Sequence, residues 1–317
     1  MNWRTCSAAL AALALIVTAT ACGAGQGQGS ASGTKQLTIG VAFPSLENSY
    51  LVTVKNAIDA EAQKQGAKVL FQAPRASADT EQAINNLNNL TAQQPDVIIA
   101  FVTGGAPLVP ALKQAAKVAP VILIDGDLPQ FTERTSFIGT DNAGAAALAG
   151  KYLVANLKSG TVGILAGTPG NPTHQQRVDG FTAALQGSGI SVVSTLRTDC
   201  DAVKGRSATE DMLTAHPDVS AIFGICDEPI DGAVQALHAR SGAHPMVLGF
   251  DASCPNLKNV QSGVETAEVA QFPVKEAQLA VQNALKVARG EKIPPRIDSG
   301  EELVTKDNVA SFITDRC

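Results

Sequence analysis

Aromatic residues, positive charge and long apolar runs are all scarce in this sequence. Aromatic side chains make up 4% of the 317 residues, and the single tryptophan is Trp3. Lys and Arg number 24 against 29 Asp and Glu, so no excess positive charge is present to drive non-specific binding of nucleic acid. Apolar residues nevertheless make up 45% of the chain, which excludes an intrinsically disordered protein. The length indicates two domains.

The common catalytic and nucleotide-binding motifs are absent from the sequence. It contains no Gly-x-x-x-x-Gly-Lys-Ser/Thr loop, no Gly-x-Gly-x-x-Gly after an expected strand and no Gly-x-Ser-x-Gly turn, which argues against nucleotide binding and serine hydrolysis. The histidines lack the spacing of metal ligands; they are His174, His216, His238 and His244. We therefore expect neither a metal nor another cofactor.

The N-terminal segment has the pattern of a bacterial export signal. An uncharged stretch follows Arg4, and its most apolar part covers residues 8–17, which predicts a signal peptide over residues 1–21. The small residues before Cys22 resemble the lipobox of bacterial lipoproteins. We expect Cys22 to be acylated and the Gly-rich residues 22–35 to form a flexible linker. The alternative is an ordinary signal peptide with a chance cysteine.

The rest of the chain would therefore be extracytoplasmic and held at the membrane by a lipid. No later stretch has the ~18 apolar residues of a membrane-spanning helix. The exported part would carry four further cysteines, namely Cys200, Cys226, Cys254 and Cys317. Four thiols in an oxidising compartment allow three pairings, and free or buried thiols are the alternative.

From residue 37 onward, short apolar runs alternate with longer amphipathic segments. The runs expected to form strands cover residues 37–43, 67–71, 96–101, 120–124, 162–165, 190–196, 220–225, 245–250 and 264–270. Helical patterns between them include 79–94, capped by Asp79, and 142–157, capped by Asp141. Such alternation predicts a doubly wound α/β fold with parallel strands. Because it restarts near Thr161, we expect two lobes with a ligand site where strands end.

Several short motifs occur in a specific order and spacing over residues 37–304. They are GVAFPSLENSY at 40–50, VILID at 121–125, GTDN at 139–142, RVDGF at 177–181, TAHPD at 214–218, CDE at 226–228, VLGFD at 247–251 and AQFP at 270–273. Together they resemble the ribose-binding protein family of periplasmic sugar receptors, the type I solute-binding proteins of ABC importers.

The resemblance implies two Rossmann-like lobes joined by a three-segment hinge, which is the type I periplasmic binding protein fold. The chain would cross between the lobes near Thr140, near Gln271 and near Asp298. The N-terminal lobe would comprise residues 36–140 plus 272–297, and the C-terminal lobe residues 141–271 plus 298–317.

The resemblance also implies which residues contact a sugar. They are Asn48, Tyr50, Asp125, Gln175, Cys200, Cys226, Asp251 and Gln271. Carboxylates can each accept hydrogen bonds from two hydroxyl groups, while amides both donate and accept. A single strand-end Asp could equally cap a helix, but the matched positions of Asp125 and Asp251 in the two lobes favour ligand binding.

Three of these positions, together with Gly126 next to Asp125, depart from ribose receptors and argue against ribose itself. Gly126 and Gln175 stand where those receptors carry arginine, Cys200 replaces an aromatic residue, and Cys226 replaces an amide. Because Cys200 and Cys226 replace two pocket residues together, we expect them to form a disulfide in the wall of the site.

The missing arginines also indicate the charge of the ligand. With Asp125, Asp127 and Asp251 near the cleft, an anion would be repelled. We expect a monomeric receptor that closes around a small neutral sugar or sugar alcohol, changes no bond in it and delivers it to an ABC permease.

Other functions would use similar features. A lipid-anchored sensor that reports to a kinase would have the same fold, and an exported glycoside hydrolase with paired Asp residues is a less favoured alternative. A signal peptide in place of a helix-turn-helix argues against a sugar-responsive repressor.

Overall fold

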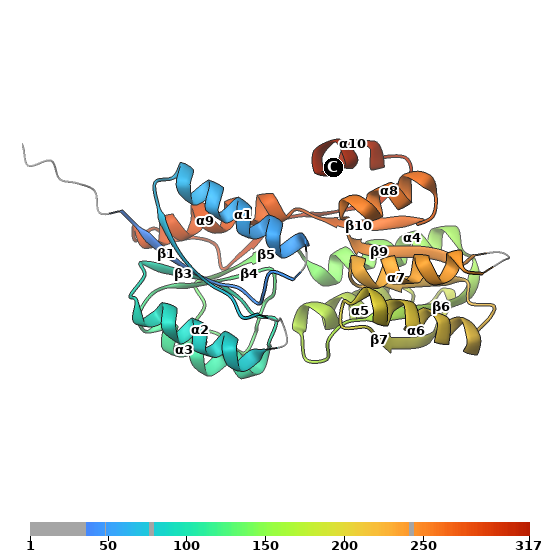
Figure 1. The fold of residues 1–317 in the computed structure, drawn as a ribbon, viewed down its shortest axis with the longest axis horizontal. Coiled ribbons are helices and arrows are strands. Elements are labelled where there is room, and N and C mark those ends of the chain that lie inside the picture. Colours follow the sequence, from blue (N-terminus) through green and yellow to red (C-terminus); the bar gives the residue numbers. More distant parts are fainter. Residues whose placement is uncertain (1–35, 48, 76–78, 241–243) are drawn as a thin grey trace, which may run out of the picture. The chain divides into compact units, whose positions relative to one another are not determined.

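The computed structural model describes residues 36–317 except 48, 76–78 and 241–243. The predicted signal peptide, Cys22 and linker lie outside the described residues, and so does Asn48. The described part contains two six-stranded sheets (Figure 1). Within it, no helix combines the length and the apolar character needed to cross a membrane.

The first sheet is wholly parallel and has the strand order β11-β5-β4-β3-β1-β2. Its strands are β1 (Thr38–Ala42), β2 (Lys68–Gln72), β3 (Val97–Phe101), β4 (Val121–Ile124), β5 (Ser136–Gly139) and β11 (Arg296–Asp298). Its helices are α1 (Ser49–Lys64), α2 (Thr80–Ala92), α3 (Val109–Ala116) and α9 (Pro273–Ala288), with the short 3-10 helix η1 (Ala106–Leu108) before α3. We call this sheet with its helices the first lobe.

Helices cover both faces of this sheet because its strands are apolar on both sides. Ile99 and Val41 pack with α1 and α9 on one face, while Ile98 and Ala100 pack with α2 and α3 on the other. The near-continuous apolar strands of the sequence are thereby buried in two layers of core.

The second sheet has the order β12-β10-β9-β8-β6-β7 and is parallel except for β12, which runs antiparallel to β10. Its strands are β6 (Ser159–Ala166), β7 (Gly189–Arg197), β8 (Ala221–Gly224), β9 (Met246–Asp251), β10 (Ala267–Gln271) and β12 (Glu301–Thr305). Its helices are α4 (Asn142–Asn156), α5 (Pro172–Ala184), α6 (Ala202–Ala215), α7 (Asp227–His238), α8 (Cys254–Ser262) and α10 (Val309–Arg316). We call these elements the second lobe.

The chain passes between the two sheets three times. It leaves β5 for α4, leaves β10 for α9, and leaves β11 for β12. The first and third crossings are joined, because Thr140 Oγ1 lies 3.3 Å from Ser299 Oγ and the Ser299 amide donates to the Gly139 carbonyl at 3.2 Å. The predicted fold of two α/β lobes is therefore confirmed, with three crossings of the chain between them.

Two expectations about individual elements need revision. Strands β5, β11 and β12 were not predicted from the sequence, and β12 adds an antiparallel edge to a sheet that we expected to be parallel. Asp79 caps α2 by accepting a hydrogen bond from the Gln82 amide at 2.9 Å, as predicted. Asp141 occupies the same place before α4, but its side chain accepts no hydrogen bond from that helix.

Candidate ligand-binding site

The predicted ligand residues include several with an unusual backbone. Among the non-glycine residues that the structure describes, six have a positive φ, and three of these are Asp125 (66°), Cys200 (54°) and Asp251 (112°). This conformation is unfavourable for residues with a Cβ atom and concentrates at functional sites. The ends of β4 and β9 therefore hold two carboxylates in strained positions.

In the second lobe, Asp251 lies at the centre of a hydrogen-bond network. Its Oδ1 accepts from Arg177 Nη1 at 3.1 Å and from Gln271 Nε2. Arg177 is buried and also donates to Asn142 Oδ1 and to the Ile225 carbonyl, both at 2.8 Å. Burial raises the pKa of the Asp251 carboxyl, and the charge of Arg177 opposes that shift.

This network corrects the charge argument made from the sequence. We expected the carboxylates near the cleft to lack cations, but Arg177 forms an ion pair with Asp251. Asp127 lies in an ion pair with Arg134 at 3.1 Å and accepts a hydrogen bond from the Leu128 amide at 2.8 Å. The excess of acid is therefore smaller than predicted.

In the first lobe, Asp125 has a different environment. Burial, opposed by Arg177 and aided by the charge of Asp251, raises the pKa of Asp125 to about 6. Tyr50, on α1, donates from its hydroxyl to Glu276 Oε2 at 3.0 Å. Burial also raises the pKa of Glu276 well above its ordinary value. The structure thus brings Tyr50, Asp125 and Asp251 within electrostatic reach of one another, together with Glu276, which the sequence did not indicate.

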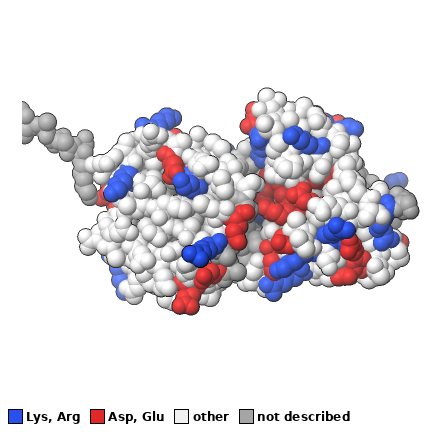
Figure 2. All heavy atoms as spheres, viewed as in Figure 1, with Lys and Arg blue, Asp and Glu red and all other residues white. Residues whose placement is uncertain are grey.

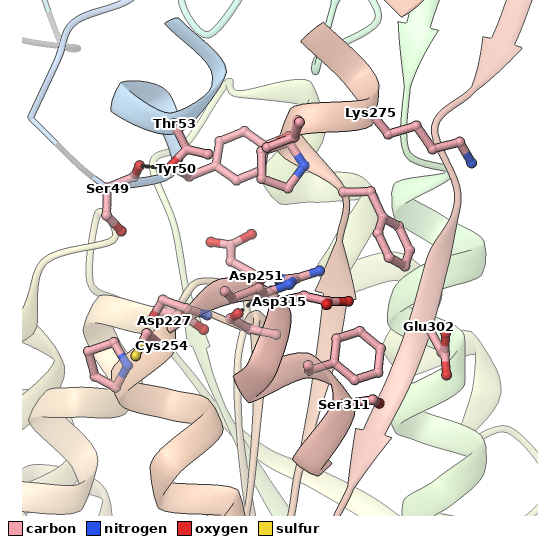
Figure 3. A pocket seen from close by; sticks show the side chains of 18 of the residues that line it. Ser49, Tyr50, Thr53, Asp227, Asp251, Cys254, Lys275, Glu302, Ser311 and Asp315 are labelled. Atoms are coloured by element: carbon pink, nitrogen blue, oxygen red, sulfur yellow. Dashed lines mark hydrogen bonds between the residues drawn. The ribbon is translucent and has the colours of Figure 1, made fainter. Parts of the chain in front are cut away.

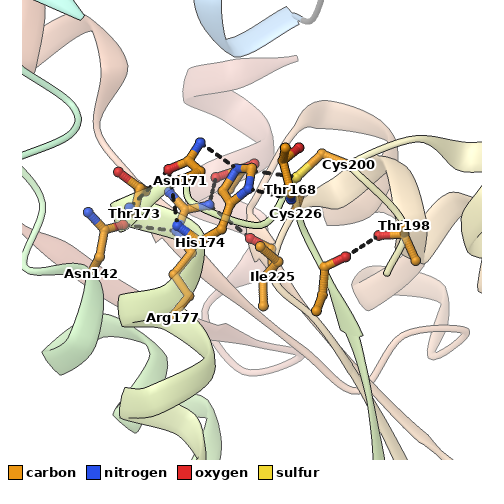
Figure 4. Close-up of a disulfide and its surroundings, with 12 residues drawn as sticks. Asn142, Thr168, Asn171, Thr173, His174, Arg177, Thr198, Cys200, Ile225 and Cys226 are labelled. Carbon is orange, nitrogen blue, oxygen red and sulfur yellow. Dashed lines mark hydrogen bonds and ion pairs between the residues drawn. A yellow bond between two sulfur atoms is a disulfide. The ribbon is translucent and has the colours of Figure 1, made fainter. Parts of the chain in front are cut away.

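Cys200 and Cys226, which we expected in the wall of the site, form a disulfide in the second lobe. Cys200 and Cys226 are bonded, with their Cα atoms 5.7 Å apart, which is an ordinary spacing. His174 Nε2 lies 3.6 Å from Cys200 Sγ, and His174 Nδ1 accepts from the Thr168 amide at 2.9 Å (Figure 4). Burial lowers the pKa of His174 to about 3, so this imidazole is neutral at physiological pH.

A cluster of His174, Cys200 and Cys226 has the composition of a metal site, and the sequence did not indicate it. Their ligand atoms lie within 4.8 Å of one another. The two sulfur atoms are bonded to each other, however, and the Nδ1 lone pair already accepts a hydrogen bond. The cluster is therefore a disulfide with a neutral imidazole packed against it.

Gln175, a predicted contact residue, faces solvent, and Gly126 lies in a tight space beside Thr173. The exposed side chain of Gln175 donates to Asp179 Oδ1 along α5 at 2.8 Å, which holds it on the surface of that helix. A Cβ atom at Gly126 would lie 3.0 Å from Thr173 Oγ1, so an arginine has little room where ribose receptors carry one.

A cavity of about 900 Å³ has two of the predicted contact residues in its lining, but not Asp125, Gln175, Cys200, Cys226 or Gln271 (Figure 3). Tyr50 and Asp251 belong to its lining, and Phe272 and Phe312 supply aromatic surface that the sequence analysis missed. Its charged lining residues are Asp227, Glu228, Asp251, Lys275, Glu302, Asp315 and Arg316. Acidic side chains accordingly gather near the middle of the face shown in Figure 2. Burial raises the pKa of Glu228 to about 7.

The comparison with known proteins identifies the family. A profile of the periplasmic binding protein domain matches residues 39–292. This chain belongs to the periplasmic binding protein family. The ribose import binding protein of Bacillus subtilis is 30% identical over 274 residues, which cover 86% of this chain and 88% of that protein. The predicted resemblance to the ribose-binding proteins is therefore confirmed.

Solved structures of other family members match nearly the whole described part. A carbohydrate transporter solute binding protein from Agrobacterium radiobacter, in complex with D-arabinose, has a TM-score of 0.84 at 28% identity, covering 89% of this chain and 99% of that one. An ABC transporter solute binding protein from Mycobacterium smegmatis with bound glycerol has a TM-score of 0.82 at 28% identity, with coverage of 88% and 97%. Both comparisons support the type I periplasmic binding protein fold.

Proposed function

We propose that this protein captures a small neutral sugar or sugar alcohol and delivers it to an ABC permease. The observation that carries the proposal is the pair of strand-end carboxylates, Asp125 and Asp251, held within electrostatic reach of each other by the two lobes. Each carboxylate can accept hydrogen bonds from two hydroxyl groups. The ribose import binding protein and the solute binding protein in complex with D-arabinose, both matched above, support the same class of ligand.

The hydrogen bonds of the neighbouring cation, Arg177, favour a neutral ligand. The guanidinium of Arg177 donates to Asn142, to the Ile225 carbonyl and to Asp251, so it has an internal carboxylate partner. Gln271 Oε1, in contrast, is buried without a hydrogen-bond partner among the described residues and can accept from a ligand hydroxyl. An anionic ligand would compete with internal carboxylates, whereas a polyol would supply the donors that they require.

Binding would proceed by closure of the lobes without chemistry on the ligand. Closure is favoured when a ligand held by one lobe completes its contacts on the other, and the three crossings near Thr140, Gln271 and Asp298 are the proposed hinge. We propose lobes of residues 36–140 plus 272–297 and 141–271 plus 298–317. We also propose that the receptor is monomeric, extracytoplasmic and anchored through an acylated Cys22.

The predicted contact set is part of the proposal. It comprises Asn48, Tyr50, Asp125, Gln175, Cys200, Cys226, Asp251 and Gln271. Of these, Tyr50 and Asp251 line the described cavity, Gln175 faces solvent, and Asn48 lies outside the described residues.

A thermal-shift screen tests the proposal. The panel would hold D-ribose, D-arabinose, D-allose, xylitol, glycerol and D-ribose 5-phosphate. A ligand at ~100 times its dissociation constant should add about 2.7 kcal/mol to the free energy of unfolding. A specific shift with one neutral member, and recovery of that ligand unchanged after incubation, is the expected result.

Two outcomes would contradict it. Tighter binding of D-ribose 5-phosphate than of D-ribose would overturn the neutral-ligand proposal. No response to any sugar or polyol, from folded protein freed of carried-over ligand, would overturn sugar capture.

A further inference from the structure

The last helix, α10, packs against the ends of the strands that carry the candidate site. Its buried residues Val309 and Phe312 join a core cluster with Leu257 of α8, Ala270 of β10 and Val304 of β12. Residues Ser311, Phe312, Asp315 and Arg316 of α10 line the cavity described above. The helix is therefore fixed next to Asp251 and Gln271, which end β9 and β10.

Arg316 joins the two strand ends through their backbone. Its Nη1 donates to the Asp251 carbonyl at 3.1 Å and to the Ala252 carbonyl at 2.9 Å, and its Nη2 donates to the Gln271 carbonyl. One planar guanidinium thus holds the ends of two neighbouring strands at once. A planar group with several fixed donors suits this task better than a flexible ammonium.

Two further features hold the Arg316 side chain in place. Its guanidinium carbon lies 5.5 Å from the centre of the Phe272 ring and 5.3 Å from that of Phe312. The next residue, Cys317, is bonded to Cys254, with the two Cα atoms 5.3 Å apart. Because Cys254 is only two residues after Ala252, the disulfide fixes the end of α10 directly beside the carbonyls that Arg316 contacts.

The backbone at these carbonyls needs such support. Asp251 and Ala252 are consecutive non-glycine residues with positive φ, 112° and 56°. Strained conformations of this kind persist only where the surroundings hold them. Arg316 bonds to the carbonyls of both residues, and the Ser253 amide after them donates to Asp227 Oδ2 at 2.6 Å.

We propose that Arg316 is a positioning residue for the ligand site. The Cys254–Cys317 disulfide and the two phenylalanine rings hold Arg316 in place. Arg316 in turn fixes the strained backbone at Asp251 and Ala252, and it fixes the distance of that backbone from Gln271. The side chains of Asp251 and Gln271 thereby keep the geometry in which a sugar hydroxyl can reach both. This inference rests on the proposed function for its effect on sugar binding, but not for its effect on the backbone.

Hydrogen–deuterium exchange of the ligand-free protein tests the backbone effect. The variants are Arg316→Ala, Arg316→Lys and, as a matched control, Arg206→Ala, because among the described residues Arg206 pairs with Glu210 alone, on the exposed face of α6. Arg316→Ala should exchange at least tenfold faster in peptides covering residues 249–255 and 270–274, with β6 and β8 unchanged. Arg316→Lys should lie between wild type and Arg316→Ala. Exchange equal to that of the control would overturn the proposal.

Calorimetric titration with D-ribose and D-arabinose tests the effect on binding. At a temperature well below melting, Arg316→Ala should weaken binding by tenfold or more, and Arg316→Lys should recover part of that loss. A helix that only stabilises the fold would lower the melting temperature without changing the dissociation constant, and that result would overturn the positioning role. If wild-type protein binds no sugar of the panel, the proposed function fails, while the exchange measurement still decides whether Arg316 holds this backbone.

The disulfide is tested by the paired variant Cys254→Ser with Cys317→Ser. It should raise exchange over residues 249–255 by twofold or more, in the direction of Arg316→Ala, because the C-terminal end of α10 then loses its covalent link to residue 254. Unchanged exchange over those residues would overturn the role of the disulfide in holding Arg316.

Discussion

Asp125 and Asp251 occupy corresponding places in the two lobes but have different surroundings. Each ends a buried parallel strand of its sheet or follows it directly, and each has a positive φ. The Asp251 side chain accepts hydrogen bonds from Arg177 and Gln271, and its carbonyl accepts one from Arg316. All three donors belong to the second lobe. The Asp125 carbonyl accepts a long contact from Asn142 Nδ2, 3.5 Å away on α4, and its carboxyl interacts with the Tyr50 hydroxyl.

This difference shows that one half of the site is assembled in advance. The second lobe supplies its own donors for Asp251, so the geometry of that carboxylate does not depend on a ligand. Arg177, a second-lobe residue, is also the cation that opposes the raised pKa of Asp125. Within the first lobe, the Tyr50 hydroxyl opposes the raised pKa of Asp125 less strongly than Arg177 does, so the neighbouring lobe contributes more to favouring this carboxylate.

The largest effect is expected from removing the cation that both carboxylates share. Arg177→Met should lower the free energy of unfolding by about 3 to 5 kcal/mol, because Asp251, Asn142 and the Ile225 carbonyl lose their buried donor. Urea denaturation monitored by circular dichroism would measure the loss. The control is Arg206→Ala, whose exposed ion pair should contribute little; equal losses in both variants would contradict the central role of Arg177.

The next largest effect should come from the Cys200–Cys226 disulfide of the second lobe. Replacing Cys200 and Cys226 together by alanine should cost about 3 kcal/mol, since the bridge closes a loop with a sequence separation of 26 residues. Peptide mapping without reductant would first establish the bridge in wild-type protein. Two free thiols at these positions, or an unchanged denaturation midpoint, would contradict the prediction.

Matched amide substitutions should separate the two carboxylates by the size of their effect. Asp125→Asn should raise the free energy of unfolding at pH 7 by on the order of 2 kcal/mol, because a carboxyl with a pKa of about 6 is unfavourable when ionised. Asp251→Asn should stabilise less than Asp125→Asn, because relief of the buried charge is offset by the loss of the ion pair with Arg177. Both variants should weaken sugar binding; equal stabilisation by both would remove the distinction.

The raised pKa of Asp125 also predicts how the effect of its substitution depends on pH. A folded pKa above the unfolded value means that the folded state binds more protons, so the contribution of Asp125 to stability falls as pH rises from about 4 through about 6. The advantage of Asp125→Asn over wild type should therefore be near zero at pH 4 and complete at pH 7. An advantage independent of pH would show that the substitution acts through packing instead.

The smallest effect concerns the helix caps of the two lobes. Asp79→Ala removes a side chain that accepts from the Gln82 amide and should cost about 1 kcal/mol. Asp141→Ala removes a side chain without such a bond to α4 and should cost under ~0.5 kcal/mol. Thermal melting of the two variants would check the order, and a larger loss at Asp141 would reverse it.

The sequence predicted most strands because long apolar runs bury both faces of a parallel sheet. Strands β5 and β11 are too short to show an apolar pattern, and acidic residues interrupt the apolar pattern of β12. Asp125 and Asp251 could be named because they follow such runs directly. The roles of Glu276 and Arg316 could not, because Glu276 meets Tyr50 across 226 positions and Arg316 acts through backbone carbonyls that carry no sequence signal.

The three crossings also have a consequence for the order in which the protein can fold during synthesis. The first lobe receives α9 and its edge strand β11 only after the whole of β6 to β10 has been made. Until α9 arrives, the face of the first sheet that contains Ile39 and Val97 lacks its cover by Ala277 and Val281. A chain still attached to the ribosome therefore keeps this core incomplete until α9 has been made.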